Sequence, residues 1–339
     1  MRLDPVINVN NLGFPWETQD PFLFCAYHED FYPKGNDNLG PIDDLKGRHL
    51  GNDFTIKDGY RMYHGQNVPG FPAHPHRGFE TVTIVKKGLV DHSDSMGASG
   101  RFGNGDVQWM TAGKGVQHAE MFPLLNKKEE NPFELFQIWI NLPKTDKFVE
   151  PHFKMLWSED QKIKTFTDSN GFKSELTVVS DYNSEDGPTP PPNSWAADIS
   201  NKVAIWNIKM EANAQITLPH LEGEINRNLY FFKGEKISIE GQNISINKRI
   251  KLNPRIPTTI KNGNKPTHLL LLQGKPIGEP VAKYGPFVMN THAELQQAIN
   301  DFQNTQFGGW PWPKKEQVHG DLKGRFAKHS DGRIEDKSK

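Results

Sequence analysis

The chain has very little cysteine, and this absence excludes several classes of protein. Cys25 is the only cysteine in 339 residues, so neither a disulfide within the chain nor a cysteine-ligated metal cluster can form. Its neighbours, Phe-Leu-Phe on one side and Ala-Tyr on the other, are apolar. We therefore expect Cys25 to be a small buried hydrophobic residue rather than a nucleophile, in a protein from a reducing compartment.

Charge of one sign and long apolar runs are also missing. The 40 Lys and Arg residues nearly cancel the 41 Asp and Glu residues, giving a net charge of −1. The composition therefore gives no sign of direct nucleic-acid binding. No apolar run approaches the roughly 20 residues of a membrane-spanning helix, and the first residues do not read as a signal peptide. We expect a cytoplasmic protein with no membrane segment.

Turn-forming residues and short apolar runs are abundant instead. The chain has 30 glycines and 25 prolines, set between many short runs that are typical of strands. This pattern indicates an all-β architecture. A chain of this length also predicts two domains.

Two short motifs in the first half carry the candidate chemistry. His74-Pro75-His76 and His118-Ala119-Glu120 each place two metal-binding side chains at positions i and i+2. On a β-strand this spacing puts both side chains on the same face. If the two strands lie side by side inside a barrel, three imidazoles and one carboxylate converge on one metal ion and leave coordination positions open.

Glu80 is a second candidate for the carboxylate ligand. It has the same parity as His74 and His76, so strand alternation alone does not exclude it. Two further histidines, His64 and His92, lie near the motifs in sequence. With Glu80, they are candidates to support the ligands through hydrogen bonds. Ordinary surface or turn positions explain both histidines equally well.

Longer strings around these motifs resemble one known family. The strings are His74 to Thr83, Asp94-Ser95-Met96-Gly97, Gly105 to Gly113, and Gly285 to Thr291. In this order they closely resemble the pirin family of the cupin superfamily, over roughly residues 15–145 and again over about 275–313. The resemblance implies a bicupin, with two barrels of the double-stranded β-helix or jelly-roll type and a metal in the N-terminal barrel only. The matching ligand positions are His74, His76, His118 and Glu120, which favours Glu120 over Glu80 as the carboxylate.

The resemblance and the pattern of turns together predict the domain limits. We expect an N-terminal arm at 1–20, a metal-binding barrel at 21–145, an inter-barrel segment at 146–174 and a metal-free barrel at 175–290. Within the last, a proline-rich stretch at 187–194 is expected to be a stiff surface loop. A helix at 291–308 should begin with a capping box of Thr291 and Glu294. Residues 309–339 are predicted to be a polar tail, in which Trp310 to Pro313 could pin the chain to the body and the residues from Lys314 onward are solvated and mobile.

The function follows from the donor set and from the resemblance. Imidazoles with one carboxylate suit a divalent transition metal, iron(II) first, with manganese, cobalt, nickel, copper or zinc as alternatives. For pirins the implied activity is quercetin 2,3-dioxygenation, the oxidative ring cleavage of a flavonol, with dioxygen as co-substrate and Glu120 as the proton acceptor. Phe71, Phe79 and Met121 are candidates to shape the apolar approach.

Two other functions remain open at this point. The same ligands would serve an iron-binding, redox-sensing regulator that acts through a protein partner. Another cupin oxidase or isomerase is a third reading. A dioxygenase needs room for an aromatic substrate beside the ligands, whereas a regulator needs a surface that responds to the charge of the metal, and sequence alone does not separate them.

Overall fold

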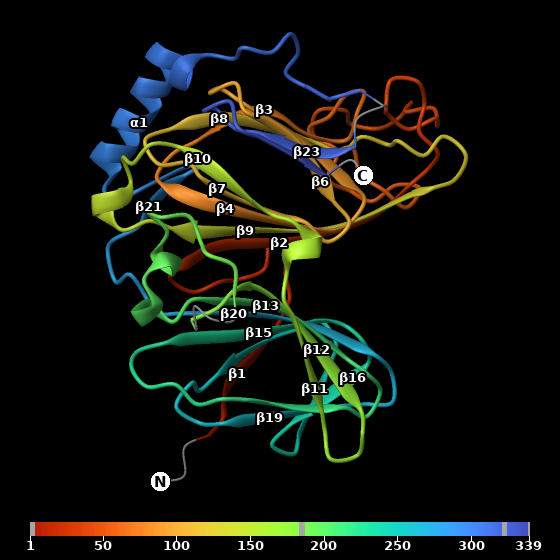
Figure 1. Ribbon diagram of the computed structural model, residues 1–339, viewed down its shortest axis with the longest axis vertical. Coiled ribbons are helices and arrows are strands. Elements are labelled where there is room, and N and C mark those ends of the chain that lie inside the picture. Colours follow the sequence, from red (N-terminus) through yellow and green to blue (C-terminus); the bar gives the residue numbers. More distant parts are fainter. Residues whose placement is uncertain (1–3, 183–186, 321–323, 338–339) are drawn as a thin grey trace. The chain divides into compact units, whose positions relative to one another are not determined.

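The computed structural model describes residues 4–182, 187–320 and 324–337, which form two compact units. The N-terminal barrel unit comprises residues 27–138, 142–158 and 279–339. The C-terminal barrel unit comprises residues 1–26, 139–141 and 159–278. Strands dominate both units (Figure 1).

Two antiparallel sheets form the C-terminal barrel unit. The larger sheet runs in the order β1 (Val6–Asn11), β18 (Lys248–Leu252), β15 (Asn226–Lys233), β20 (Thr267–Gly274), β13 (Ala204–Met210), β12 (Lys173–Ser180), β11 (Ile163–Thr167). The smaller sheet runs β14 (Gln215–Leu218), β19 (Thr258–Asn262), β16 (Lys236–Ile239), β17 (Gln242–Ser245). Their facing side chains are mostly Ile, Leu and Val and make one apolar core, as in a barrel closed by two sheets.

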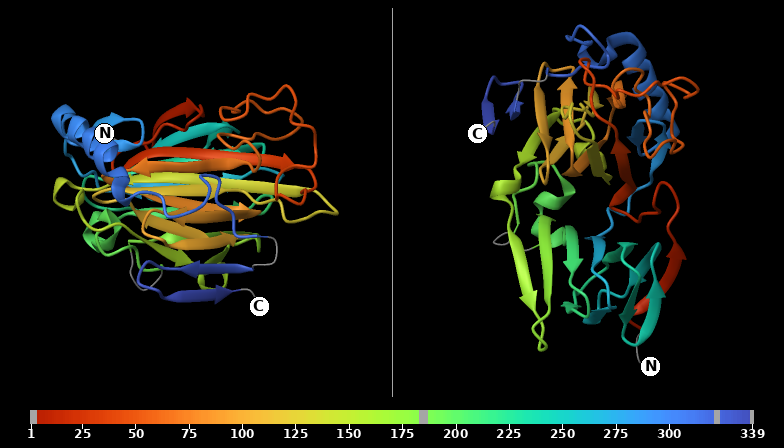
Figure 2. Two further views of the ribbon diagram at one scale, coloured as in Figure 1. Left: turned by 90° about the horizontal axis from the view of Figure 1, so that it is seen from above. Right: turned by 90° about the vertical axis from the view of Figure 1, so that its right-hand side faces the viewer.

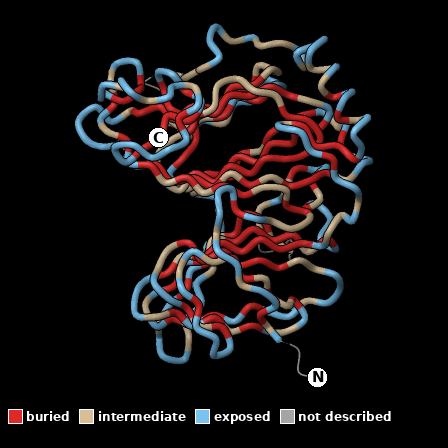
Figure 3. Tube along the Cα trace, turned by 180° about the vertical axis from the view of Figure 1, so that it is seen from behind, coloured by how far each residue is buried: buried red, intermediate tan, exposed pale blue. Residues whose placement is uncertain are grey.

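Two other sheets form the N-terminal barrel unit. One has the order β10 (His152–Leu156), β7 (Val107–Thr111), β4 (Phe79–Lys87), β9 (Asn131–Asn141), β2 (Phe22–Tyr32). The other has the order β24 (Ile334–Lys337), β23 (Arg325–Lys328), β6 (Ser99–Gly103), β5 (Leu89–Asp94), β8 (Val116–Met121), β3 (Gly70–His76). Figure 2 shows these strands in two further views. Their buried stretches contrast with the exposed loops that join them (Figure 3).

The α-helix α1 (His292–Thr305) begins as the sequence predicts. The Thr291 side chain accepts a hydrogen bond from the Glu294 amide, and the Glu294 side chain accepts one from the Thr291 amide, so the capping box is confirmed. The helix packs on the hairpin of β21 (Ala282–Tyr284) and β22 (Phe287–Met289). An ion pair of 2.6 Å between Arg77 and Asp301 ties it to the N-terminal barrel unit, as expected for a helix that returns to this barrel.

The prediction of a mobile tail is wrong for the described residues from Lys314 onward, whereas the expected attachment of residues 310–313 is seen at Trp312. Strand β23 pairs with β6, and β24 pairs with β23, so the tail extends a sheet of the barrel. The indole of Trp312 donates to the Asp94 carbonyl, and that of Trp157 donates to the Glu335 carboxylate. Backbone pairing with an edge strand needs few apolar side chains, which explains why composition pointed to a solvated tail.

The two units divide the chain differently from the predicted limits. Residues 6–11 of the predicted arm form β1, which pairs with β18. Residues 279–290 group with the N-terminal barrel unit instead of the second barrel. The predicted inter-barrel segment contains the strands β10 and β11, together with short 3-10 turns at η1 (Lys144–Asp146) and η2 (Ser158–Asp160).

Three other 3-10 turns and a buried thiol complete the description. The turns are η3 (Trp195–Ala197), η4 (Ile199–Asn201) and η5 (Gln306–Gly308). The proline-rich stretch 187–194 leads into η3, with Ser194 as its N-cap, and residues 183–186 just before it lie outside the described residues. Cys25 is fully buried, and burial raises the pKa of its thiol, as a buried hydrophobic role requires. No helix among the described residues has the length and apolar character needed to cross a membrane.

Candidate metal centre

Strands β3 and β8 bring three histidines together. The two strands pair antiparallel with His74 opposite His118, so alternation places His74, His76 and His118 on one face. Their ligating ring nitrogens all lie within 4.8 Å of one another. The Nε2 atoms of His74 and His76 are 3.1 Å apart. This group is the cluster that the predicted motifs required.

The hydrogen bonds of these rings suit a bound cation. The Nδ1 of His74 lies 2.8 Å from the Pro72 carbonyl oxygen, which can only accept, so Nδ1 carries the proton and Nε2 keeps its lone pair. Both ring nitrogens of His118 are buried, and neither has a hydrogen-bond partner among the described residues. Two ligand nitrogens about 2.1 Å from one ion and at right angles would be about 3.0 Å apart. The separation seen between His74 and His76 fits that arrangement.

Burial keeps the three imidazoles neutral. It lowers the pKa of His74 to about 4 and holds the pKa values of His76 and His118 well below the usual range. The neighbouring histidines lower these pKa values further, because each disfavours a second positive charge nearby. Near neutral pH the three rings therefore present lone pairs, which a divalent metal requires.

Glu120 lies beside this group and is held by two polar side chains. Its Oε2 is 3.8 Å from the Nε2 of His118. Its Oε1 accepts a hydrogen bond of 2.9 Å from the Thr83 hydroxyl, and its Oε2 accepts one of 3.4 Å from the Gln137 amide. Burial raises the pKa of Glu120, whereas the Thr83 hydrogen bond lowers it. A cation among the three imidazoles would favour the ionised carboxylate.

A β-bulge in β3 places an aromatic ring next to the same carboxylate. The register shifts between Phe71 and His74, so Phe71 lies opposite Glu120 while His74 lies opposite His118. Strict alternation would put positions 71 and 74 on opposite faces, and the extra residue brings both to the interior. The rings of Phe71 and His74 have centroids 6.4 Å apart. Phe71 thus forms an apolar wall beside the group.

The other two apolar candidates take different positions. The Phe79 ring lies 5.0 Å from that of His76, so it does border the histidines. Met121 follows Glu120 on β8 and packs with Leu39 and Val68, away from the group. Its side chain therefore has no part in the approach.

His92 lies directly beside the predicted ligands. On β5 it is paired with Glu120, and Asp94 is paired with His118. The His92 ring is 5.6 Å from that of His118, and its Nε2 is 3.2 Å from the Asp94 carboxylate. His92 thus lies next to the predicted ligands, but the described hydrogen bond of its ring is with Asp94, so its support of the ligands stays a prediction.

Glu80 is not brought to the group. Strand β3 ends at His76 and β4 begins at Phe79, so parity does not carry across the corner at Gly78. Gly78 has φ 85°, and a Cβ there would meet the Val288 carbonyl oxygen at 2.0 Å, so only glycine fits. On β4, Glu80 accepts a hydrogen bond from Thr111 on the sheet face opposite to Thr83.

His64 lies at the surface next to Phe71. It is exposed, and its ring is 5.7 Å from the Phe71 ring. In the part of the chain that the structure describes, His64 makes no hydrogen bond with the other three histidines, and its Nδ1 is 2.7 Å from the Gly51 carbonyl oxygen. Its position is at the rim of the site rather than against the ligands.

Sequence reasoning missed the groups that hold Glu120. Gln137 is a polar residue within the apolar run Phe133 to Leu142, and a polar residue in such a run is a usable signal. Asp94 has the same i, i+2 spacing from His92 that drew attention to the ligand motifs. Thr83 gave no signal, because threonine is common in strands.

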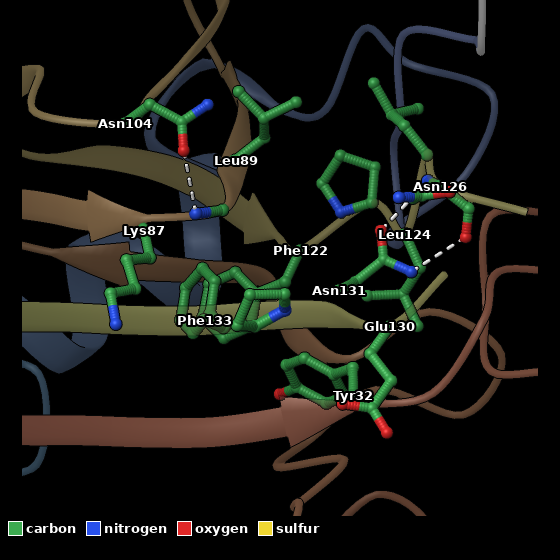
Figure 4. Close-up of a pocket in the computed structure, with 14 residues that line it drawn as sticks. Tyr32, Lys87, Leu89, Asn104, Phe122, Leu124, Asn126, Glu130, Asn131 and Phe133 are labelled. Carbon is green, nitrogen blue, oxygen red and sulfur yellow. Dashed lines mark hydrogen bonds between the residues drawn. The ribbon is translucent and has the colours of Figure 1, made fainter. Parts of the chain in front are cut away.

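A separate cavity of about 360 Å³ lies by the β4–β5 turn of the N-terminal barrel unit (Figure 4). The rings of Tyr32, Phe122 and Phe133 line it, and the side-chain amides of Asn104 and Asn131 in its wall already make hydrogen bonds to the backbone. Asn104 accepts from the Gly88 amide, and Asn131 donates to the Asn126 carbonyl. We therefore assign the candidate chemistry to the histidine group.

Comparisons with known proteins show the family of this chain. Residues 16–140 match the family described as Pirin, and residues 205–308 match the Pirin C-terminal cupin domain. The Pseudomonas aeruginosa protein named "Putative quercetin 2,3-dioxygenase PA2418" is 36% identical over 247 residues, covering 71% of this chain and 80% of that protein. Human pirin is 31% identical over 264 residues, covering 73% of this chain and 80% of human pirin.

A solved structure agrees as well. The crystal structure of quercetin 2,3-dioxygenase from Acinetobacter baumannii matches with a TM-score of 0.70 and 26% identity, covering 90% of this chain and 98% of that one. The all-β bicupin prediction is confirmed by these matches and by the strand content. The chain therefore belongs to the pirin family of the cupin superfamily.

Proposed function

We propose that this protein is a metal-dependent dioxygenase that opens the ring of a flavonol or a related enol. The observation that carries the proposal is the convergence of three neutral imidazoles beside a buried carboxylate. The names of the Pseudomonas and Acinetobacter relatives support the same reaction class. In that reaction both atoms of dioxygen enter the product and one ring carbon leaves as carbon monoxide.

His74, His76, His118 and Glu120 would hold the ion, which we expect to be iron(II). When bound, the ion supplies a Lewis-acidic centre that favours the deprotonated enol. The three histidines are neutral, so one carboxylate leaves the centre with a net positive charge. Such a centre suits an anionic oxygen of the substrate.

The residues of this chain would perform the proton transfer and the positioning. Glu120 would accept the enol proton, because its carboxylate lies beside the three imidazoles where the enol oxygen would bind. Thr83 and Gln137 would fix the Glu120 carboxylate through hydrogen bonds, and the Phe71 ring would shield one side of that carboxylate from water. His92 is paired with Glu120 across β5 and β8, and its ring would help to hold the neighbouring ligands in position.

Oxygen uptake tests the proposal directly. We expect iron(II)-loaded protein to consume dioxygen in a quercetin-dependent, saturable way, and chelator-stripped protein to consume none. Glu120→Gln should lower turnover by about 100-fold or more. Glu80→Gln is the matched control, because Glu80 is equally buried but faces away from the group.

No uptake by protein with confirmed bound iron would contradict the dioxygenase proposal. Full turnover in a folded Glu120→Gln variant would contradict the role of that carboxylate. A partner-binding regulator remains a prediction from the sequence, and capture experiments in the two iron oxidation states would then be the next measurement.

A further inference from the structure

The long loop between β2 and β3 adds aromatic rings outside the histidine group. Phe54 is 39% exposed and His64 is exposed, and their ring centroids are 4.9 Å apart. The His64 ring is 5.7 Å from that of Phe71, which is 6.4 Å from that of His74. The four rings thus form a continuous row from solvent to a candidate metal ligand.

Hydrogen bonds fix the backbone that carries the two outer rings. Asp53 and Tyr63, which precede Phe54 and His64, exchange backbone hydrogen bonds of 2.8 and 3.0 Å. The Asp53 carboxylate accepts from Arg48, and the Tyr63 hydroxyl donates to the buried Asp30 at 2.6 Å. A surface held this firmly loses little entropy when a ligand binds, which favours a recognition role.

The orientation of His64 indicates what it would bind. Its Nδ1 is 2.7 Å from the Gly51 carbonyl oxygen, which can only accept, so Nδ1 carries a proton. In the neutral ring, Nε2 is then an acceptor. An exposed acceptor beside an aromatic ring suits a hydroxyl group on an aromatic ligand.

Space for such a ligand adjoins His64. A cavity of about 470 Å³ is lined by His64, Pro72, Lys314, Lys315 and Glu316, among others, and Phe54 adjoins it through its contact with the His64 ring. This volume lies within the range of small-molecule pockets. Lys314 and Lys315 add two positive charges and Glu316 adds one negative charge, so the lining is net positive, which favours a hydroxylated ring whose oxygens are partly negative.

We propose that Phe54 and His64 are specificity-determining residues that bind the pendant ring of the substrate, with His64 accepting a hydrogen bond from a phenolic hydroxyl of that ring. This inference rests on the proposed function, because it concerns the substrate of the same site. It narrows that substrate to hydroxylated aryl enols. Phe54 supplies the apolar contact, and His64 distinguishes hydroxylated from unhydroxylated rings.

The test is a binding titration of the full-length, iron(II)-loaded protein without oxygen. Two probes are used: quercetin, and galangin, the flavonol whose pendant ring carries no hydroxyl. His64→Phe keeps a ring but removes the acceptor, so quercetin binding should weaken about five- to tenfold while galangin binding stays the same. Phe54→Ala should weaken both about three- to tenfold. Phe166→Ala is the matched control, because Phe166 is a similarly exposed phenylalanine in the C-terminal barrel unit and should change neither.

The outcomes separate this inference from the proposed function. Wild-type affinity for quercetin in both site variants, equal loss of the two flavonols in His64→Phe, or no binding of either flavonol by the wild type would each overturn the inference. Binding that depends on Phe54 and His64 in a protein that consumes no dioxygen would support the inference and refute the dioxygenase. Quercetin turnover by the wild type, with unchanged flavonol binding in the Phe54 and His64 variants, would support the dioxygenase and overturn the inference.

Discussion

Replacing Thr83 by valine should weaken metal binding without removing any proposed ligand. The Thr83 hydroxyl lies 2.9 Å from the Glu120 carboxylate and 2.7 Å from the Gln137 amide oxygen. A hydroxyl has one proton, so Thr83 donates either to Glu120 or to the Gln137 amide oxygen at any moment, while the Gln137 Nε2 donates to Glu120. Valine has the same shape but leaves the carboxylate without its shorter hydrogen bond.

The magnitude follows from that lost hydrogen bond. A hydrogen bond to a charged group contributes about 1.5–3 kcal/mol, and loss of a group that orients a metal ligand typically costs about 10–100-fold in affinity. We therefore expect the metal dissociation constant of Thr83→Val to rise about 10–100-fold. The Thr83 hydrogen bond also lowers the pKa of Glu120, so protons should compete with the metal at a higher pH in the variant.

Competition with a chromophoric chelator measures this effect on protein whose fold is checked by circular dichroism. Thr81→Val is the control, since Thr81 is equally buried on the same strand and the same face but is not bonded to Glu120 among the described hydrogen bonds. An affinity for Thr83→Val within about threefold of the wild type would refute the reasoning, because it would mean that the carboxylate needs no support from Thr83.

Three further predictions concern stability. The site histidines have lowered pKa values in the folded chain, about 4 for His74, so the unfolded chain binds more protons between about pH 6.5 and pH 4. Metal-free protein should therefore lose about 1.4 kcal/mol per pH unit for each such histidine as pH falls through this window, and urea titrations with a flat pH profile would contradict it. Thr291→Ala removes the α1 cap and should cost about 1 kcal/mol in thermal denaturation, whereas an unchanged midpoint would show that tertiary packing alone holds the helix. Ending the chain after residue 320 removes β23 and exposes the edge of β6 around residues 99–101, so the melting temperature should fall and light scattering should rise; a truncated protein as stable and monodisperse as the full chain would refute the structural role of the tail.

The sequence by itself determined the features that depend on local patterns. In His74-Pro75-His76 and His118-Ala119-Glu120, the i, i+2 spacing places both side chains on one face of a strand, and the three histidines do converge. The capping box depends on Thr291 and Glu294, which are three positions apart, so it was readable as well. The single cysteine and the frequent turns similarly bounded the fold class before any contact was known.

Only the tertiary structure decided how strands meet and where alternation breaks. The bulge in β3 brings Phe71 beside Glu120, and the corner at Gly78 turns Glu80 away, because the register is set by pairing with distant strands. Thr83 and Gln137 reach Glu120 from a different sheet, a contact that no local pattern encodes. The tail became strands through backbone hydrogen bonds to β6, which are nearly independent of side-chain composition, so its polar sequence could not reveal them.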